Sequence, residues 1–311
     1  MQKIPVYLVT GFLGSGKTTF IQRAIEYFTG KAKIGIVQNE FAPANVDGKV
    51  LKRVTNQDFD LLEINNGSAF CVCLLSDFIT SLEKFVLRYN PDLLLIETSG
   101  LSDIISVGEV FNSGNLQELI YLSGTFGIVD AVHYMKIKDL MPRVKRQLMI
   151  ADHLFINKTD LNQNTAIIKK YLNEINPFAR KYFTVYCKAD FIDIFQPFPH
   201  PSWEKLPVFV VDTEINNRPD VHSVVYRTVR PALNEKFKEF INEIASKSYR
   251  VKGIVYTNNG KCFTVQAVFG HVEYKEITTS ELKTELIVIG KEMDAKNLRI
   301  IFKRYSTNSN L

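Results

Sequence analysis

The segment that most constrains the fold is GFLGSGKT, residues 11–18. It follows the apolar run PVYLVT and precedes TTFIQRAIEYFTG, whose apolar residues have helical spacing. A G-x-x-x-x-G-K-T string between a strand and a helix is typical of a phosphate-binding loop, and this context disfavours a chance glycine-rich turn. Its glycines let backbone amides point at phosphate oxygens, and the helix N-terminus adds a positive dipole end. The predicted phosphate-contacting residues are Gly11, Phe12, Leu13, Gly14, Ser15, Gly16, Lys17, Thr18 and Thr19.

Apolar runs and helical segments alternate through the first two thirds of the chain. The further runs are KIGIVQN, FDLLEI, DLLLIET, TFGIVDA, HLFIN and YFTVY. Helix-like segments separate most of them, for example 74–89, 136–150 and 166–174. This alternation predicts an α/β fold of the P-loop type, a mostly parallel sheet with helices on both faces.

The pattern changes at FQPFPHPSWEKLP, residues 195–207, where four prolines and little periodicity indicate a linker. Beyond it, VHSVVYRT predicts a strand and ALNEKFKEFINEIAS an amphipathic helix. YRVKGIVYT, KCFTVQAVFG, HVEYKEI and ELIVIGK predict four strands, the first two joined by an NNG turn. We therefore expect a P-loop domain over residues 1–194, a linker over 195–219 and a smaller α+β domain over 220–311.

A phosphate loop needs an acidic residue at the end of a neighbouring strand to hold Mg²⁺, directly or through water. The run LLLIETSG supplies Glu97, with Gly100 three residues further on to let a backbone N–H meet the γ-phosphate. Lys17 is predicted to reach the β- and γ-phosphates, and the Thr18 hydroxyl to ligate the metal. Lys17, Thr18 and Glu97 are thus the predicted catalytic set; an ordinary strand-end carboxylate is the alternative for Glu97.

The segment LFINKTDL indicates which base is bound. Asp160 follows a strand and can accept two hydrogen bonds from the N1–H and the 2-amino group of guanine. Adenine would leave this carboxylate unpaired, a penalty that gives discrimination of roughly 10⁴ or more. The aliphatic part of Lys158 can cover the base, and Asn157 can connect this segment to the phosphate loop. The predicted ligands are GTP and GDP.

Composition excludes several classes of protein. The chain has 311 residues with both charge signs interleaved and a formal net charge of +5, which does not favour a nucleic-acid partner. No apolar run approaches the ~20 residues that span a bilayer, and the N-terminus lacks the pattern of a signal peptide. Four cysteines are too few for a disulfide scaffold and favour a reducing, cytoplasmic setting. No membrane partner is expected.

Together these motifs resemble the CobW-type GTPases, P-loop proteins tied to metal and cobalamin-related metabolism. VTGFLGSGKTTF, NEFAPANVDG, IETSGL, RQLMIADHLFINKTDL and NEINPFAR are similar to successive blocks of that family. HSVVYRT, YRVKGIV and ELIVIGK are similar to its C-terminal domain, which separates this chain from the compact urease and hydrogenase maturation GTPases. The resemblance implies a metal chaperone or a maturation factor for a client metalloprotein that the sequence does not identify.

The family usually carries G-C-x-C-C, whose cysteines bind zinc or another transition metal. This chain has GSAFCVCLL instead, which keeps Cys71 and Cys73 but not the full thiolate set. Two thiolates make an incomplete zinc site, so a further ligand is needed, and Glu40 is the best candidate, ahead of Asp47 and His133. Zn²⁺ and Co²⁺ both suit such a donor set. Packing of both thiols as small buried hydrophobes is the alternative, as is a redox role.

Three functions compete. The first is a Mg²⁺-dependent GTPase with slow intrinsic turnover that handles a metal, in which Glu40 either binds that metal or orients the attacking water. The second is a GTP-gated module that docks a client without metal transfer. The third is a small-molecule kinase or ATPase on the same loop, for which NKTD would be a coincidence. Cys187 and Cys262 lack ligand-like neighbours in the sequence and are predicted to be structural.

Overall fold

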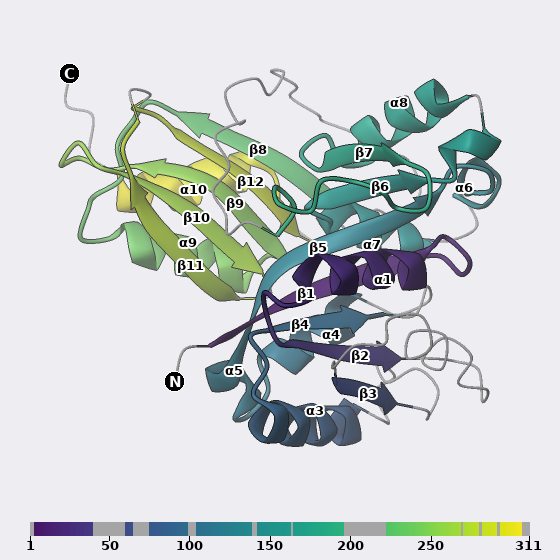
Figure 1. Cartoon of the computed structure of the whole chain (residues 1–311). Coiled ribbons are helices and arrows are strands. Elements are labelled where there is room, and N and C mark those ends of the chain that lie inside the picture. Colours follow the sequence, from purple (N-terminus) through teal and green to yellow (C-terminus); the bar gives the residue numbers. More distant parts are fainter. Residues whose placement is uncertain are drawn as a thin grey trace. The chain divides into compact units, whose positions relative to one another are not determined.

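The computed structural model divides the chain into two compact units, residues 1–197 and 198–311 (Figure 1). The structure describes the following residues: 3–39, 60–64, 75–98, 104–138, 142–162, 164–195, 222–268, 270–279, 282–290 and 293–306. Within these ranges, no helix is both long and apolar enough to cross a membrane. The predicted linker lies almost entirely outside them, so the predicted domain boundaries stay predictions.

The first unit is built on a seven-stranded sheet in the order β3-β2-β4-β1-β5-β6-β7, with every pair parallel. Its strands are β1 (Ile4–Gly11), β2 (Ile34–Asn39), β3 (Asp60–Ile64), β4 (Leu93–Glu97), β5 (Ile120–Asp130), β6 (His153–Asn157) and β7 (Arg180–Thr184). Strands β2 to β4 lie on one side of β1, and β5 to β7 lie on the other. The strand order therefore reverses at β1, and ligands of open α/β sheets bind beyond the carboxyl ends of strands at such a point.

Helices connect these strands. They are α1 (Lys17–Phe28), α3 (Leu75–Tyr89), α4 (Ile104–Phe111), α5 (Leu116–Leu119), α6 (Tyr134–Ile137), α7 (Pro142–Ile150), the 3₁₀ turn η1 (Thr159–Leu161) and α8 (Thr165–Ile175). The single helix predicted over 136–150 is wrong: α6 ends at Ile137 and α7 begins at Pro142. Proline has no N–H to donate and its ring clashes with the carbonyl four residues earlier, so it starts a helix but does not continue one.

Both faces of the sheet are covered, as the continuous apolar strands predict. In β6, Phe155 belongs to one core cluster with Phe20 of α1, whereas Leu154 and Ile156 belong to another with Leu148 of α7. The mostly parallel P-loop fold with helices on both faces is therefore confirmed.

The second unit contains a five-stranded antiparallel sheet in the order β11-β10-β9-β12-β8. Its elements are β8 (His222–Thr228), α9 (Phe237–Ser246), β9 (Arg250–Tyr256), β10 (Cys262–Val268), β11 (His271–Ile277), β12 (Thr284–Gly290) and α10 (Ala295–Tyr305). The predicted α+β character and all five predicted strands are present. Helix α10 was not predicted, although Asp294 caps it by accepting the N–H of Asn297 and its buried residues Leu298, Ile301 and Phe302 have helical spacing.

Candidate nucleotide site

The phosphate loop joins the end of β1 to the start of α1. Gly11 and Gly16 have φ of +145° and +110°, and a Cβ atom added there would lie 2.3 Å from the Ile128 carbonyl oxygen and 2.4 Å from Asn157 Nδ2 respectively. Glycine is required at both positions because no other residue fits. Gly14 also has a positive φ, +74°, but faces open space. The loop is therefore held tightly at its two ends and is open at its centre, as a cradle for phosphate requires.

Helix α1 presents its N-terminus to this loop. Its first N–H groups have no intrahelical acceptor and are available to an anion. Lys17 is the first residue of the buried face, followed by Phe20, Ile21, Ala24 and Ile25. Helical spacing therefore fixes where the lysine stem lies, packed inward rather than free in solvent.

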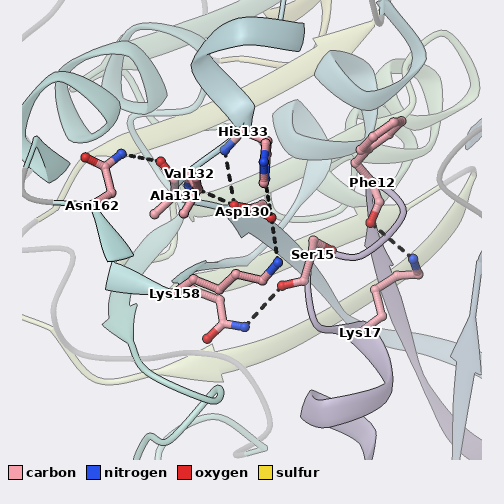
Figure 2. A network of polar contacts seen from close by, with 10 residues as sticks. Phe12, Ser15, Lys17, Asp130, Ala131, Val132, His133, Lys158 and Asn162 are labelled. Carbon is pink, nitrogen blue, oxygen red and sulfur yellow. Dashed lines mark hydrogen bonds and ion pairs between the residues drawn. The ribbon is translucent and has the colours of Figure 1, made fainter. Parts of the chain in front are cut away.

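Lys17 and Glu97 lie together at the carboxyl edge of the sheet. The Lys17 Nζ atom is 3.8 Å from Glu97 Oε1 and 3.4 Å from the Phe12 carbonyl oxygen (Figure 2 shows the latter contact). Both charged residues are at most 9% exposed. Gln38, which is opposite Glu97 in the β2–β4 register, donates from Nε2 to Glu97 Oε2 over 3.0 Å. Gln38 was not predicted, and it holds the carboxylate in place from the neighbouring strand.

The predicted base-reading segment lies two strands away from β1. Asn157 ends β6, Lys158 has φ +64°, and Asp160 is exposed in η1. Asn157 is 3% exposed; its Nδ2 donates to the Ser15 carbonyl over 3.1 Å, and its Oδ1 accepts the N–H of Cys187 over 3.0 Å. The contact expected between Asn157 and the phosphate loop is therefore present.

Cys187, in the segment after β7, contacts both Asn157 and the phosphate loop. It is fully buried, and its Sγ lies 3.6 Å from the Gly16 carbonyl oxygen. Burial raises the pKa of the thiol to about 12, against weaker opposing effects of Arg23 and Lys158. Cys262 of β10 is also buried, and burial raises its pKa as well. Both thiols are protonated and enclosed, in agreement with the structural role predicted for them.

The hydroxyl groups around the loop provide a test of whether the site suits a nucleotide and Mg²⁺. The Oγ atoms of Thr10, Ser15 and Thr98 are buried and have no hydrogen-bond partner within the part of the chain that the structure describes. Buried polar atoms without partners are rare and call for a specific explanation. Oxygen donors next to a lysine and a carboxylate fit phosphate oxygens and a hard cation such as Mg²⁺. The residues present therefore fit the predicted ligands.

Other predicted site residues are not placed. Glu40, Cys71, Cys73 and Gly100 lie outside the described residues. Within the described ranges, no three His, Cys, Asp or Glu side chains are grouped so that they could hold a metal ion. The predicted transition-metal site therefore stays a prediction.

The fold and this edge of the sheet define a P-loop nucleotide-binding protein. Residues 5–183 match the family described as the CobW/HypB/UreG nucleotide-binding domain, and residues 221–305 match the cobalamin synthesis protein cobW C-terminal domain. The chain belongs to the CobW/HypB/UreG family. The resemblance inferred from the sequence motifs is thereby confirmed.

Curated relatives are similar over different shares of the chain. The zinc chaperone CobW of Sinorhizobium sp is 33% identical over a match that covers 51% of this chain and about half, 52%, of that protein. The zinc-regulated GTPase metalloprotein activator 1 of Saccharomyces cerevisiae is 25% identical, covering 86% of this chain and 71% of the relative. The zinc chaperone YjiA of Escherichia coli is 26% identical over a match that covers 82% of this chain and 83% of that protein.

Among solved structures, the Zn(II)-bound YjiA GTPase from E. coli aligns with 99% of this chain and 100% of its own, with a TM-score of 0.66. The sequence identity in that alignment is 20%, so the likeness concerns the fold alone.

Proposed function

We propose that this protein is a Mg²⁺-dependent GTPase that handles a metal ion for a client metalloprotein. The observation that carries the GTP part is the bridge made by Asn157, whose amide joins the Ser15 carbonyl of the phosphate loop to the segment that contains Asp160. This bridge supports the assignment of the proposed phosphate-binding and base-reading groups to one site. Family membership and the GTPase named among the relatives support the same conclusion.

Each residue has a distinct role in this proposal. Lys17 binds the β- and γ-phosphates, Thr18 and Glu97 hold Mg²⁺, and Gln38 keeps the Glu97 carboxylate oriented. When bound, Mg²⁺ supplies neutralisation of phosphate charge, and positioning with charge neutralisation accounts for most catalysis of phosphoryl transfer. No general base lies in the phosphate loop, so slow intrinsic turnover is expected, with acceleration by a metal or a partner.

Replacing Asp160 with Asn tests the choice of base. The Asn side chain keeps an acceptor for the N1–H of guanine but turns an N–H towards the 2-amino group. Asp160→Asn should therefore weaken GTP binding by a factor of roughly 10² or more and favour the xanthine nucleotide, whose 2-oxo group is an acceptor at that place. Calorimetric titration with GTP, XTP and ATP measures this. Asp193→Asn, which removes an exposed carboxylate elsewhere in the same unit, is the matched control. Equal affinity of the unmodified protein for ATP and GTP would contradict the proposal and favour the kinase or ATPase alternative.

The metal part of the proposal is supported by the relatives named as zinc chaperones and by the Cys71–Cys73 pair. In this role Zn²⁺ is cargo rather than a resident cofactor, and Co²⁺ is the alternative cargo of similar ligand preference. If Glu40 belongs to a nucleotide-responsive loop, nucleotide state and metal affinity are coupled, and the coupling is reciprocal.

Zinc titration separates this function from that of a GTP-gated docking module without metal transfer. The Cys71→Ser/Cys73→Ser variant should lose at least tenfold in Zn²⁺ affinity, and the affinity of the unmodified protein should differ between GDP and a GTP analogue. Cys262→Ala, which removes a buried thiol of the second unit, serves as the control. Identical stoichiometry and affinity in both proteins would remove the metal role and leave the docking module. A cytoplasmic location belongs to the same proposal.

A further inference from the structure

Asp130 ends β5 at the same edge of the sheet as the phosphate loop. In the β5–β6 register it lies opposite Asn157, and its side chain is 8% exposed. Its Oδ1 atom accepts the backbone N–H groups of Val132 and His133 at 2.8 and 3.1 Å. One carboxylate oxygen is thus fixed by the turn that follows the strand, so the orientation of the other oxygen is set before any other side chain approaches.

The second oxygen, Oδ2, holds Lys158. The Lys158 Nζ atom lies 2.7 Å away, and the more exposed His133 ring reaches the same oxygen through Nδ1 at 3.1 Å (Figure 2). Burial raises the pKa of Asp130, but the hydrogen bonds from Lys158, His133 and the two amides outweigh it, and the pKa lies below its ordinary value. Asp130 is therefore charged at neutral pH and forms an ion pair with Lys158.

Lys158 is held at both of its ends. Its backbone directly follows β6 in a left-handed conformation, φ +64°, while its ammonium group is bound to Asp130. The methylene chain between these points cannot sample the rotamers of a free lysine, and lysine is among the side chains that lose most conformational entropy when they are ordered on binding. Fixing the side chain in advance removes that cost from association with a ligand.

We propose that Asp130 is a positioning residue for the base: it stretches Lys158 so that the methylene chain forms one wall of the guanine pocket. This inference rests on the proposed GTP-binding function and adds to it the residue that organises the wall. The apolar stem covers the ring while the charged end stays on its carboxylate. Asp130 itself does not touch the nucleotide.

A purely structural role is the competing explanation. The Ala131 N–H donates to the Asn157 carbonyl over 2.9 Å, and Asn162 Nδ2 donates to the Ala131 carbonyl, so the two loops are joined by other bonds as well. If Asp130 only connected the two loops, its replacement would weaken the binding of every ligand of the site. If it positions Lys158, only ligands that carry a base are affected.

The test is a double-mutant cycle with two ligands, GDP and inorganic triphosphate. Asp130→Asn keeps the shape and the acceptor for the two amides, and Lys158→Met keeps the methylene chain. Each substitution should weaken GDP binding about tenfold, and the double variant should bind GDP no more weakly than either single variant. The affinity for triphosphate should change less than twofold in all three. Asp152→Asn is the matched control, a carboxylate at the opposite end of β6 that accepts the Thr125 N–H, and should leave GDP affinity within twofold.

Each result decides a different claim. Independent, multiplying losses in the double variant, or equal weakening of triphosphate and GDP, would overturn the positioning role. If Asp130→Asn does not fold, Lys158→Met alone remains decisive, because unchanged GDP affinity would mean that an anchored ammonium is unnecessary. Absence of any guanine preference in the unmodified protein would instead overturn the proposed function.

Discussion

The polar groups of the two units differ in how they are paired. At the carboxyl edge of the first sheet, Lys17 and Glu97 face each other at 3.8 Å, and the hydroxyls of Thr10, Ser15 and Thr98 lack hydrogen-bond partners among the described residues. These three hydroxyls retain donors and acceptors that the described part of the chain does not use. Unmet polar capacity concentrated at one edge indicates a surface built for a ligand.

In the second unit, polar groups mostly satisfy one another. Glu243 of α9 accepts from Lys247 at 2.8 Å, from Arg304 of α10 at 2.7 Å and from the Tyr305 hydroxyl at 2.8 Å. The Ser306 hydroxyl is an exception. In this unit a carboxylate stabilises the packing of two helices. Hydroxyls without partners therefore gather beside the phosphate loop of the first unit, whereas the carboxylate between α9 and α10 of the second unit is fully engaged by neighbouring side chains.

The largest effect is expected when one glycine in each unit is replaced by alanine, because the added Cβ would clash in both places. Gly16→Ala should reduce GTP hydrolysis roughly 100-fold, because displacement of the phosphate loop by about 1 Å is sufficient for that loss. Gly253 has φ +152°, and an added Cβ would lie 2.0 Å from the Glu285 carbonyl oxygen, so Gly253→Ala should cost about 1–3 kcal/mol of stability. Hydrolysis assays and calorimetric unfolding measure both effects. Comparable loss of hydrolysis in both variants would show that the units are not separate in function.

A smaller effect is expected from the two buried thiols, one in each unit. In a Cys71→Ser/Cys73→Ser background, alkylation of Cys187 and Cys262 requires local opening, because both are enclosed. GDP at ten times its Kd should slow labelling of Cys187 roughly tenfold, since Cys187 contacts the phosphate loop within the first unit. Mass spectrometry of the labelled peptides gives the two rates. Equal protection of Cys262 would contradict the separation of the units.

The smallest effect concerns Glu243. The hydrogen bond from Lys247 is the main cause that lowers its pKa to about 2 from 4.5, with Tyr305 and Arg304 adding to it. Because the folded pKa is depressed, the stabilisation is complete above pH 4.5 and is lost as the pH falls towards 2. Glu243→Gln should destabilise the second unit by about 1 kcal/mol near pH 7, and the difference from the unmodified protein should shrink below pH 4.5.

Urea unfolding at several pH values measures this difference, with Glu235→Gln at an exposed position as the control. A difference that stays constant from pH 7 to pH 3 would exclude the ionised Glu243 carboxylate as its source.

In the first unit, features formed by contiguous residues could be predicted from the sequence, whereas features that depend on contacts between distant residues could not. The strand, the glycine loop and the helix are contiguous, so their spacing defines the phosphate site directly. Gln38 and Asp130 were missed because their partners, Glu97 and Lys158, are 59 and 28 residues away and become neighbours only through the strand order. A single sequence does not contain that order.

In the second unit, the missed element had a local signal. Helix α10 begins after Asp294, a favourable N-cap, and repeats apolar residues at helical spacing. The prediction for this region followed the run of strands that precedes α10 and did not use this pattern. By contrast, the αL conformation at Tyr186 and Cys187, φ +52° for both, has no signal in residue type, since non-glycine residues seldom adopt it.

The Asn157 bridge also has a consequence for biosynthesis. The glycine loop is translated well before the residues that support it, because the Asn157 amide follows Ser15 by 142 positions and the Cys187 thiol follows Gly16 by 171. Contacts of such sequence separation form late, because their loop-closure entropy is large. A nascent chain therefore acquires a supported phosphate loop only when nearly the whole first unit has left the ribosome. Nucleotide binding during synthesis would then indicate that this unit has folded.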